Sequence, residues 1–275
     1  MTTQSPTRLA PRVRDPARPI WTIAGVCWLA TLVLEVSGAI EAGHHDVVLD
    51  GEGPSSLVRV AGFLLVWTVM VGAMMLPTMI PMARLVHAVT GPHAHAVRER
   101  TGLYAAYLAV WMLFGVAALA FDSTVHWTVE HNHWLHHHEG LVLAGALLLA
   151  GAFQFSTLKD SCLTACRTPM TMLWQHYGRG TGSIWRLGVA HALSCLGCCW
   201  ALMLVMFATG VGSLAWMFGL TAVMVLEKTA PWGHRLVVPT GLGLIAAGLG
   251  PEPAGVATRA GARRRRFDTV HFVRS

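Results

Sequence analysis

Charged residues are scarce in this sequence. Only 12% of its 275 residues are Asp, Glu, Lys or Arg, whereas soluble domains contain about 25%. The sequence also has no glycine-rich phosphate loop, no Ser/His/Asp arrangement, no nucleic-acid-binding module and no internal repeat. Six cysteines in so long a chain do not form a disulfide scaffold. These absences argue against a soluble protein and against a nucleic-acid partner.

Apolar residues make up 54% of the chain and fall into long runs. Because a membrane-spanning helix needs about 20 consecutive apolar residues, these runs predict several crossings of a lipid bilayer. The runs cover residues 20–40, 57–82, 103–121, 141–158, 187–210, 214–226 and 236–249. The predicted fold is therefore an all-α, polytopic transmembrane helical bundle of about seven helices. The last run is short, so six helices plus a re-entrant last segment is the alternative.

The basic residues predict how this bundle is oriented and how the chain is divided. Segments 84–100, 159–186 and 228–235 carry most of the Lys and Arg between the runs, which places them and the N-terminus in the cytoplasm. Residues 1–19 are predicted to be a disordered basic leader, residues 20–250 the transmembrane domain and residues 251–275 a disordered basic tail. The side of the membrane on which the tail lies stays open.

Three cysteines and a histidine lie close together within the fifth run. Because an α-helix turns about 100° per residue, His191, Cys195, Cys198 and Cys199 share one helix face. Polar and soft side chains on a membrane helix are costly unless they have a function. This face is therefore the first candidate for a functional site.

Two further groups of soft side chains are predicted to lie near this face. Cys162 and Cys166 follow the fourth run and form an i,i+4 pair if the helix continues. Met74, Met75 and Met79 lie near the end of the second run, where Pro77 is expected to kink the helix and free backbone carbonyls. Under the predicted orientation, all three groups meet in the cytoplasmic half of the bundle.

Thiolate and thioether ligands select Cu(I), zinc or iron–sulfur clusters, and thioethers favour copper. The spacing of these cysteines differs from that of zinc ribbons and ferredoxin-type sites. Copper is therefore the predicted metal and zinc the alternative. The competing interpretation is that the cysteines and methionines only fill the core, because both residue types pack well there.

Other polar residues are open to simpler interpretations. The histidines between residues 126 and 138 lie in a predicted outer loop. They either capture metal ions outside the cell or are simply solvated. Glu227 and Lys228 are interpreted as a structural ion pair at a helix end, and Cys27 as a packing residue.

The motifs resemble a known family. They are Lys159-Asp-x-Cys162-Leu-x-x-Cys166-Arg167-x-Pro169, His191-x3-Cys195-x-Gly197-Cys198-Cys199-Trp200, Ala73-Met74-Met75-Leu-Pro77 and Glu227-Lys228-x-x-Pro231. Over roughly residues 60–250 the chain resembles the bacterial predicted metal-binding integral membrane proteins, long classed as a domain of unknown function and sometimes labelled copper chaperone. Residues 192–194 are Ala-Leu-Ser, where that family often has Gly-x-Tyr. The resemblance implies a location in the bacterial inner membrane and binding of a metal, copper above all.

The predicted function is metal handling: holding Cu(I), passing it to a donor or acceptor protein, or helping to insert it into a membrane enzyme. The preferred ligands are Cys162, Cys166, Cys195, Cys198 and Cys199, with His191, Met74, Met75 and Met79 as auxiliaries. A membrane thiol–disulfide oxidoreductase and a metal transporter are the alternatives. Since no reaction is identified, a non-enzymatic role is preferred.

Overall fold

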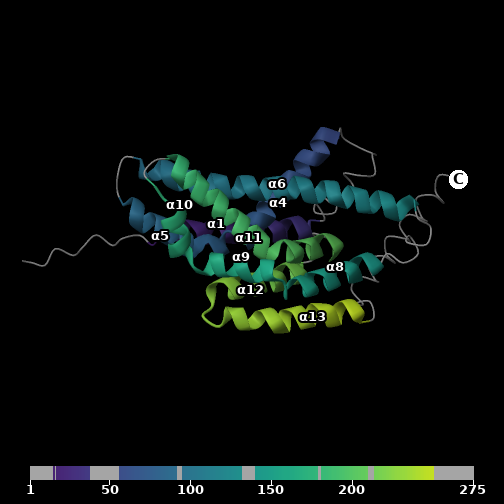
Figure 1. Ribbon diagram of the computed structural model, residues 1–275. Coiled ribbons are helices and arrows are strands. Elements are labelled where there is room, and N and C mark those ends of the chain that lie inside the picture. The colour runs from purple at the N-terminus through teal and green to yellow at the C-terminus, as the bar shows by residue number, and fades with distance from the viewer. Residues whose placement is uncertain are drawn as a thin grey trace, which may run out of the picture.

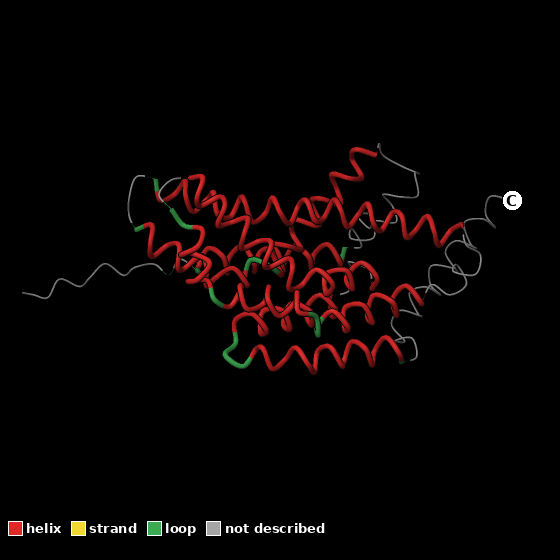
Figure 2. Tube along the Cα trace, in the orientation of Figure 1, coloured by secondary structure: helices red, strands yellow, loops and turns green. Residues whose placement is uncertain are grey.

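The protein is a bundle of helices, as the tube along its chain shows (Figure 2). The computed structural model describes residues 15, 17–37, 56–91, 95–131, 140–178, 181–209 and 214–250. Within these ranges there are ten α-helices and two short 3-10 helices, and no strand. The predicted all-α helical bundle is confirmed.

Most of the helices run side by side along one direction (Figure 1). In chain order the elements are α1 (Arg18–Val36), α4 (Ser56–Met74), η1 (Pro77–Met79), α5 (Ile80–Thr90), α6 (Ala96–His131), α8 (Gly140–Phe153), α9 (Thr157–Arg167), α10 (Pro169–His176), α11 (Thr181–Thr209), α12 (Leu214–Thr229), η2 (Gly233–Leu236) and α13 (Val237–Leu249). Helix α11 contacts α6, α8, α9, α10 and α12, which makes it the central helix of the bundle.

In the described part of the chain, three helices are long and apolar enough to cross a membrane: Arg18–Val36, Ala96–Val125 and Gly182–Met206. Two bent pairs raise the number to five if each pair counts as one span. These pairs are α4 with the segment Pro77–Thr90, bent by 47°, and α8 with α9, bent by 65°. Each of the seven predicted runs lies largely in helix, but α12 and α13 have only 16 and 13 residues. The described residues therefore contain three to five candidate spans, fewer than the seven that were expected.

Several predicted loops are helical. Segment 84–100 contains the end of α5 and the start of α6, and segment 159–186 contains α9, α10 and the start of α11. The predicted histidine loop is also partly helical, because α6 continues to His131. Residues 132–139 of that loop, and nearly all of the predicted leader and tail, lie outside the described residues.

The break between α4 and α5 follows from proline chemistry. Pro77 has no N–H, so the carbonyl of Ala73 loses its helical donor. The indole of Trp28 donates to that carbonyl instead, over 3.1 Å, and ties α1 to the break. The carbonyl of Met75 accepts a hydrogen bond from the backbone N–H of Thr78 and, in addition, from the hydroxyls of Thr78 and of Tyr107 in α6. The predicted kink at Pro77 is confirmed, and the freed Ala73 carbonyl is satisfied by a side chain from another helix.

Helix α13 packs against α8 in the opposite direction. A Cβ atom at Gly241 would meet Phe155 and Gln154, whereas one at Gly248 would meet Leu147, Leu148 and the Ala144 carbonyl. Small residues permit this close approach of two helices. The described part of the last run is therefore one straight helix along α8.

Candidate metal centre

The cysteine face of α11 is fully buried. Cys195, Cys198 and Cys199 are each 1% exposed, and His191 is 3% exposed. Helix α11 begins at Thr181, so Cys195 lies 14 residues, or about 21 Å, along it. The hydropathy pattern predicted that this helix begins at residue 187, which would put Cys195 in the cytoplasmic half of the bundle. The structure places it near the middle of the candidate span Gly182–Met206.

Helix α9 brings two more thiols to this face. The thiols of Cys166 and Cys198 lie close enough to interact. Cys162 lies opposite Gly197, where an added Cβ atom would be 2.5 Å from its sulfur. The glycine in Cys195-Leu-Gly-Cys198 therefore makes room for a cysteine from the neighbouring helix. The predicted convergence of the two cysteine groups agrees with these contacts.

Lys228 of α12 points its ammonium group at the thiols. Its Nζ atom lies 3.0 Å from the sulfur of Cys195 and 3.8 Å from that of Cys199. The hydroxyl of Tyr107 lies 3.0 Å from the same Cys195 sulfur. Lys228 is only 7% exposed and Tyr107 is completely buried. Cys195 thus stands at the centre of a buried polar cluster, and a positive charge this close stabilises a thiolate.

Glu227 forms its ion pair with a different lysine from the one expected. Its carboxylate lies 2.6 Å from the Nζ atom of Lys159 in α9, and both side chains are 1% exposed. Adjacent residues of a helix point about 100° apart and do not face each other. The interpretation of Glu227 and Lys228 as a pair was therefore wrong: the first faces α9 and the second faces the thiols of α11.

The end of α12 is held in place by α9. The guanidinium group of Arg167 donates to the carbonyls of Glu227 and Pro231. Gly233 lies so close to the end of α12 that an added Cβ atom would be 2.6 Å from the Glu227 carbonyl. These contacts fix the position of Lys228 relative to the thiols.

The predicted methionine ligands share the buried core with the cysteines. Met74, Met75 and Met79 are completely buried. Two side chains connect the methionine segment to the cysteines. The hydroxyls of Tyr107 and Thr78 donate to the backbone carbonyl of Met75, and both hydroxyls also lie near the Cys195 sulfur. The break in the second run therefore lies against the thiol cluster.

His191 has unused ligand capacity. Both of its ring nitrogens are buried, and neither has a hydrogen-bond partner among the residues that the structure describes. Its ring stacks on that of Tyr107 with 5.9 Å between centroids. A buried polar group without a partner costs free energy, so a bound ligand would stabilise this side chain.

The donors are not arranged as a ready multidentate cage. Within the described residues, no three His, Cys, Asp or Glu side chains are grouped so that they could hold a metal ion. The cysteine side chains of α9 and α11 lie near one another, and Lys228 lies beside those of Cys195 and Cys199.

Lys228, Lys159, Tyr107 and Thr78 are the residues around the thiols that the sequence analysis did not select. Lys159 and Lys228 come just after the apolar runs 141–158 and 214–226, so they were assigned to the basic segments between the runs. A charge beside an apolar run nevertheless needs a partner if the helix continues through it. No pattern in the sequence distinguishes Tyr107 or Thr78.

The fold and the cluster define an all-α protein with apolar, span-length helices around buried thiols and a buried lysine. The chain belongs to the copper chaperone family PpoB2, whose family model matches residues 64–250. The predicted resemblance is confirmed over nearly the same residues. Comparison with curated proteins gives no significant match, and neither does comparison with solved structures. The family and the cysteine cluster together indicate copper handling, whereas zinc has no support.

The buried pair of Glu227 and Lys159 gives a stability prediction. The substitution Glu227→Gln leaves the Lys159 charge buried without its partner, which should lower the free energy of unfolding by about 3–5 kcal/mol. Asp160→Asn is the control, because the Asp160–His234 pair is more than 60% exposed and such pairs contribute at most about 1 kcal/mol. Denaturant unfolding in detergent measures both variants. Equal effects of the two substitutions would contradict the structural role of the buried pair.

Proposed function

We propose that the chain is a membrane-embedded Cu(I) chaperone that carries the ion on the buried thiols of Cys166, Cys195, Cys198 and Cys199. The observation that carries this proposal is the Lys228 ammonium 3.0 Å from the Cys195 sulfur, within a cluster of thiols. Metal ligation needs the thiolate form of cysteine, and a fixed positive charge favours that form without water.

The charge of the cluster favours a monovalent ion. Two thiolates and one Cu(I) ion carry one net negative charge, which the ammonium of Lys228 balances. The other buried lysine, Lys159, is already balanced by Glu227. A divalent ion on the same two thiolates would leave the charge of Lys228 unbalanced in the protein interior, where charges are costly. Copper(I) on a pair of thiolates is therefore the best match to the local charges.

The remaining predicted ligands have supporting roles in this proposal. His191 offers a free ring nitrogen one turn from Cys195. Cys162 is the least buried of the clustered thiols, so it is suited to receive or release the ion at the edge of the site. Met74, Met75 and Met79 lie in the same buried core as the thiols, and in this proposal their soft thioethers take part as the ion moves.

A location in the bacterial inner membrane with the N-terminus in the cytoplasm fits the distribution of aromatic and basic residues. Trp21 in the first turn of α1, Trp174 in α10 and Trp185 early in α11 are exposed, and all lie toward the end of the bundle where α10 lies. Exposed tryptophans mark the level of lipid headgroups. We take residues 20–250 as the membrane domain, and the arginines near this end as the cytoplasmic signal.

Burial separates this proposal from the rival functions. Thiol–disulfide exchange needs a thiol that a partner disulfide can reach. Cys195, Cys198 and Cys199 are 1% exposed and Cys166 is 8% exposed. Of the clustered thiols only Cys162 is partly exposed, so a partner disulfide can reach at most one of them, whereas a small ion can reach the others through local motion. A donor or acceptor protein for copper is the implied partner. A transporter would have to release the ion on the opposite side, and flux across vesicles distinguishes that role.

The thiol ligands can be tested by metal analysis. The triple substitution of Cys195, Cys198 and Cys199 by Ser should abolish Cu(I) binding by protein purified in detergent, because it removes three of the four central thiols. Cys27→Ser is the matched control, since Cys27 packs against Gly72 away from the cluster. Unchanged copper stoichiometry in the triple variant would refute the site.

The role of Lys228 can be tested by removing or keeping its charge. Lys228→Met should weaken Cu(I) binding at least about tenfold, since opposite charges 4 Å apart contribute about 4 kcal/mol at an effective dielectric constant of 20 and about 1.4 kcal/mol is a factor of ten. Lys228→Arg keeps the charge and should retain most of the affinity. Competition with a Cu(I) chelator measures both constants. Tighter copper binding by Lys228→Met would mean that the lysine opposes the metal.

A further inference from the structure

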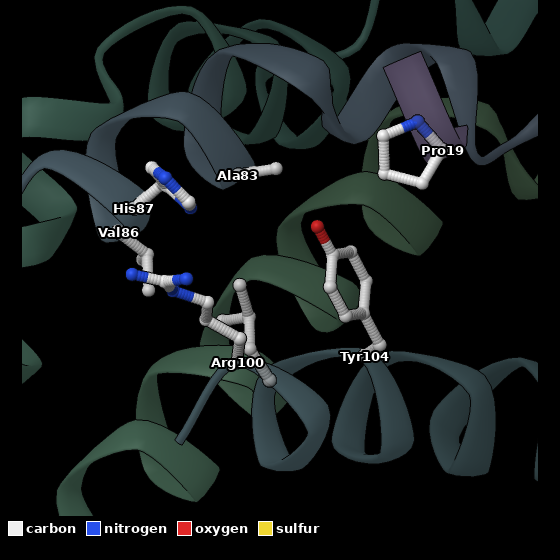
Figure 3. Close-up of a pocket in the computed structure, with 7 residues that line it drawn as sticks. Pro19, Ala83, Val86, His87, Arg100 and Tyr104 are labelled. Carbon is white, nitrogen blue, oxygen red and sulfur yellow. The ribbon is translucent and has the colours of Figure 1, made fainter. Parts of the chain in front are cut away.

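A pocket unconnected with the thiol cluster lies where α1 begins, α5 ends and α6 begins (Figure 3). Its volume is about 200 Å³. The lining residues are Pro19, Ala83, Val86, His87, Arg100, Leu103 and Tyr104. Figure 1 places these helix ends together at the same end of the bundle as α10. The pocket therefore lies at the level of the exposed tryptophans.

Hydrogen bonds fix the position of Arg100 in the pocket, but they do not use all of its N–H donors. Arg100 donates to the hydroxyl of Thr90 over 3.1 Å and to the carbonyl of Gly91 over 2.8 Å. These bonds use two of its five N–H groups and fix the guanidinium group beside the end of α5. Figure 3 shows His87 and Arg100 on one side of the pocket, with the Tyr104 oxygen directed toward its middle.

The positive charge of this pocket is not balanced by its walls. None of the lining residues is acidic. Nearby Arg84 does have a partner: its guanidinium group lies 3.0 Å from the Asp15 carboxylate and lowers the pKa of that group. Arg84 is therefore paired outside the pocket, whereas Arg100 faces the pocket, whose described lining residues include no carboxylate.

We propose that this pocket binds the phosphate group of an anionic ligand, with Arg100, His87 and Tyr104 as its hydrogen-bonding residues. Arginine pairs with phosphate through strong, charge-assisted hydrogen bonds. The apolar walls formed by Pro19, Val86 and Leu103 accommodate the carbon part of the same ligand. Basic pockets between helices at a cytoplasmic interface suit anionic lipid headgroups. A soluble phosphate compound has the same chemistry, and the experiment distinguishes the two sources.

The test uses the full chain in detergent. Native mass spectrometry with phosphatidylglycerol and phosphatidylcholine should find one phosphatidylglycerol retained per protein, and calorimetry with inorganic phosphate tests the soluble source. Arg100→Gln should weaken binding at least about tenfold and Tyr104→Phe about threefold, because they remove a charged and a neutral hydrogen-bond donor. Tyr104→Phe keeps the shape of the pocket and all bonds of Arg100, so it reports on binding even if Arg100→Gln loosens α5.

The matched control is Arg84→Gln, a change of the same charge just outside the pocket, which should leave binding unchanged. Retention of inorganic phosphate but not of the lipid, with the same ranking of variants, would support the pocket and assign a soluble ligand. Equal losses in Arg84→Gln and Arg100→Gln, or no effect of Tyr104→Phe, would overturn the proposal. Copper binding by these variants should stay intact, so this outcome is independent of the copper site.

Discussion

A lysine ammonium held against cysteine sulfur in the protein interior is the interaction on which the rest of the site depends. Removing a charge from water is costly unless a partner compensates it. Lys228 finds that partner in Cys195 at 3.0 Å, and Lys159 finds its own in Glu227 at 2.6 Å. The first pair favours the thiolate form of Cys195 inside the bundle, whereas the second joins α9 and α12 through an ion pair. Two adjacent residues of α12 thus face two different partners.

Breaks in the neighbouring helices position the polar groups that surround the thiols. The breaks between α4 and α5 and between α8 and α9 interrupt two apolar runs close to the cluster. At the first break, the hydroxyls of Tyr107 and Thr78 bridge the Met75 carbonyl and the Cys195 sulfur. Beyond the second, α9 supplies Cys166, Lys159 and Arg167 within three turns. Irregular backbone in a membrane is tolerated where protein groups satisfy it, and here those groups are also the walls of the site.

Much of this arrangement could be predicted from the sequence because it depends on periodicity. The 100° turn of an α-helix placed His191 and the three cysteines of α11 on one face, and that face is buried. Proline chemistry predicted the break at Pro77. The same periodicity also predicts that the adjacent side chains of Glu227 and Lys228 point about 100° apart and do not pair with each other. The partners of these residues lie on other helices, however, and a single sequence does not contain their distances. Helix ends were also misplaced, since polar residues at 84–100 and 159–186 continue helices that the hydropathy pattern ends.

The central claim is that copper binds to buried cysteine sulfur beside Lys228. X-ray absorption spectroscopy at the copper edge of the Cu(I)-loaded full-length protein tests it most directly. The proposed site predicts a monovalent ion whose first coordination shell is dominated by two sulfur atoms. A shell made of nitrogen and oxygen alone, or a divalent ion, would contradict it.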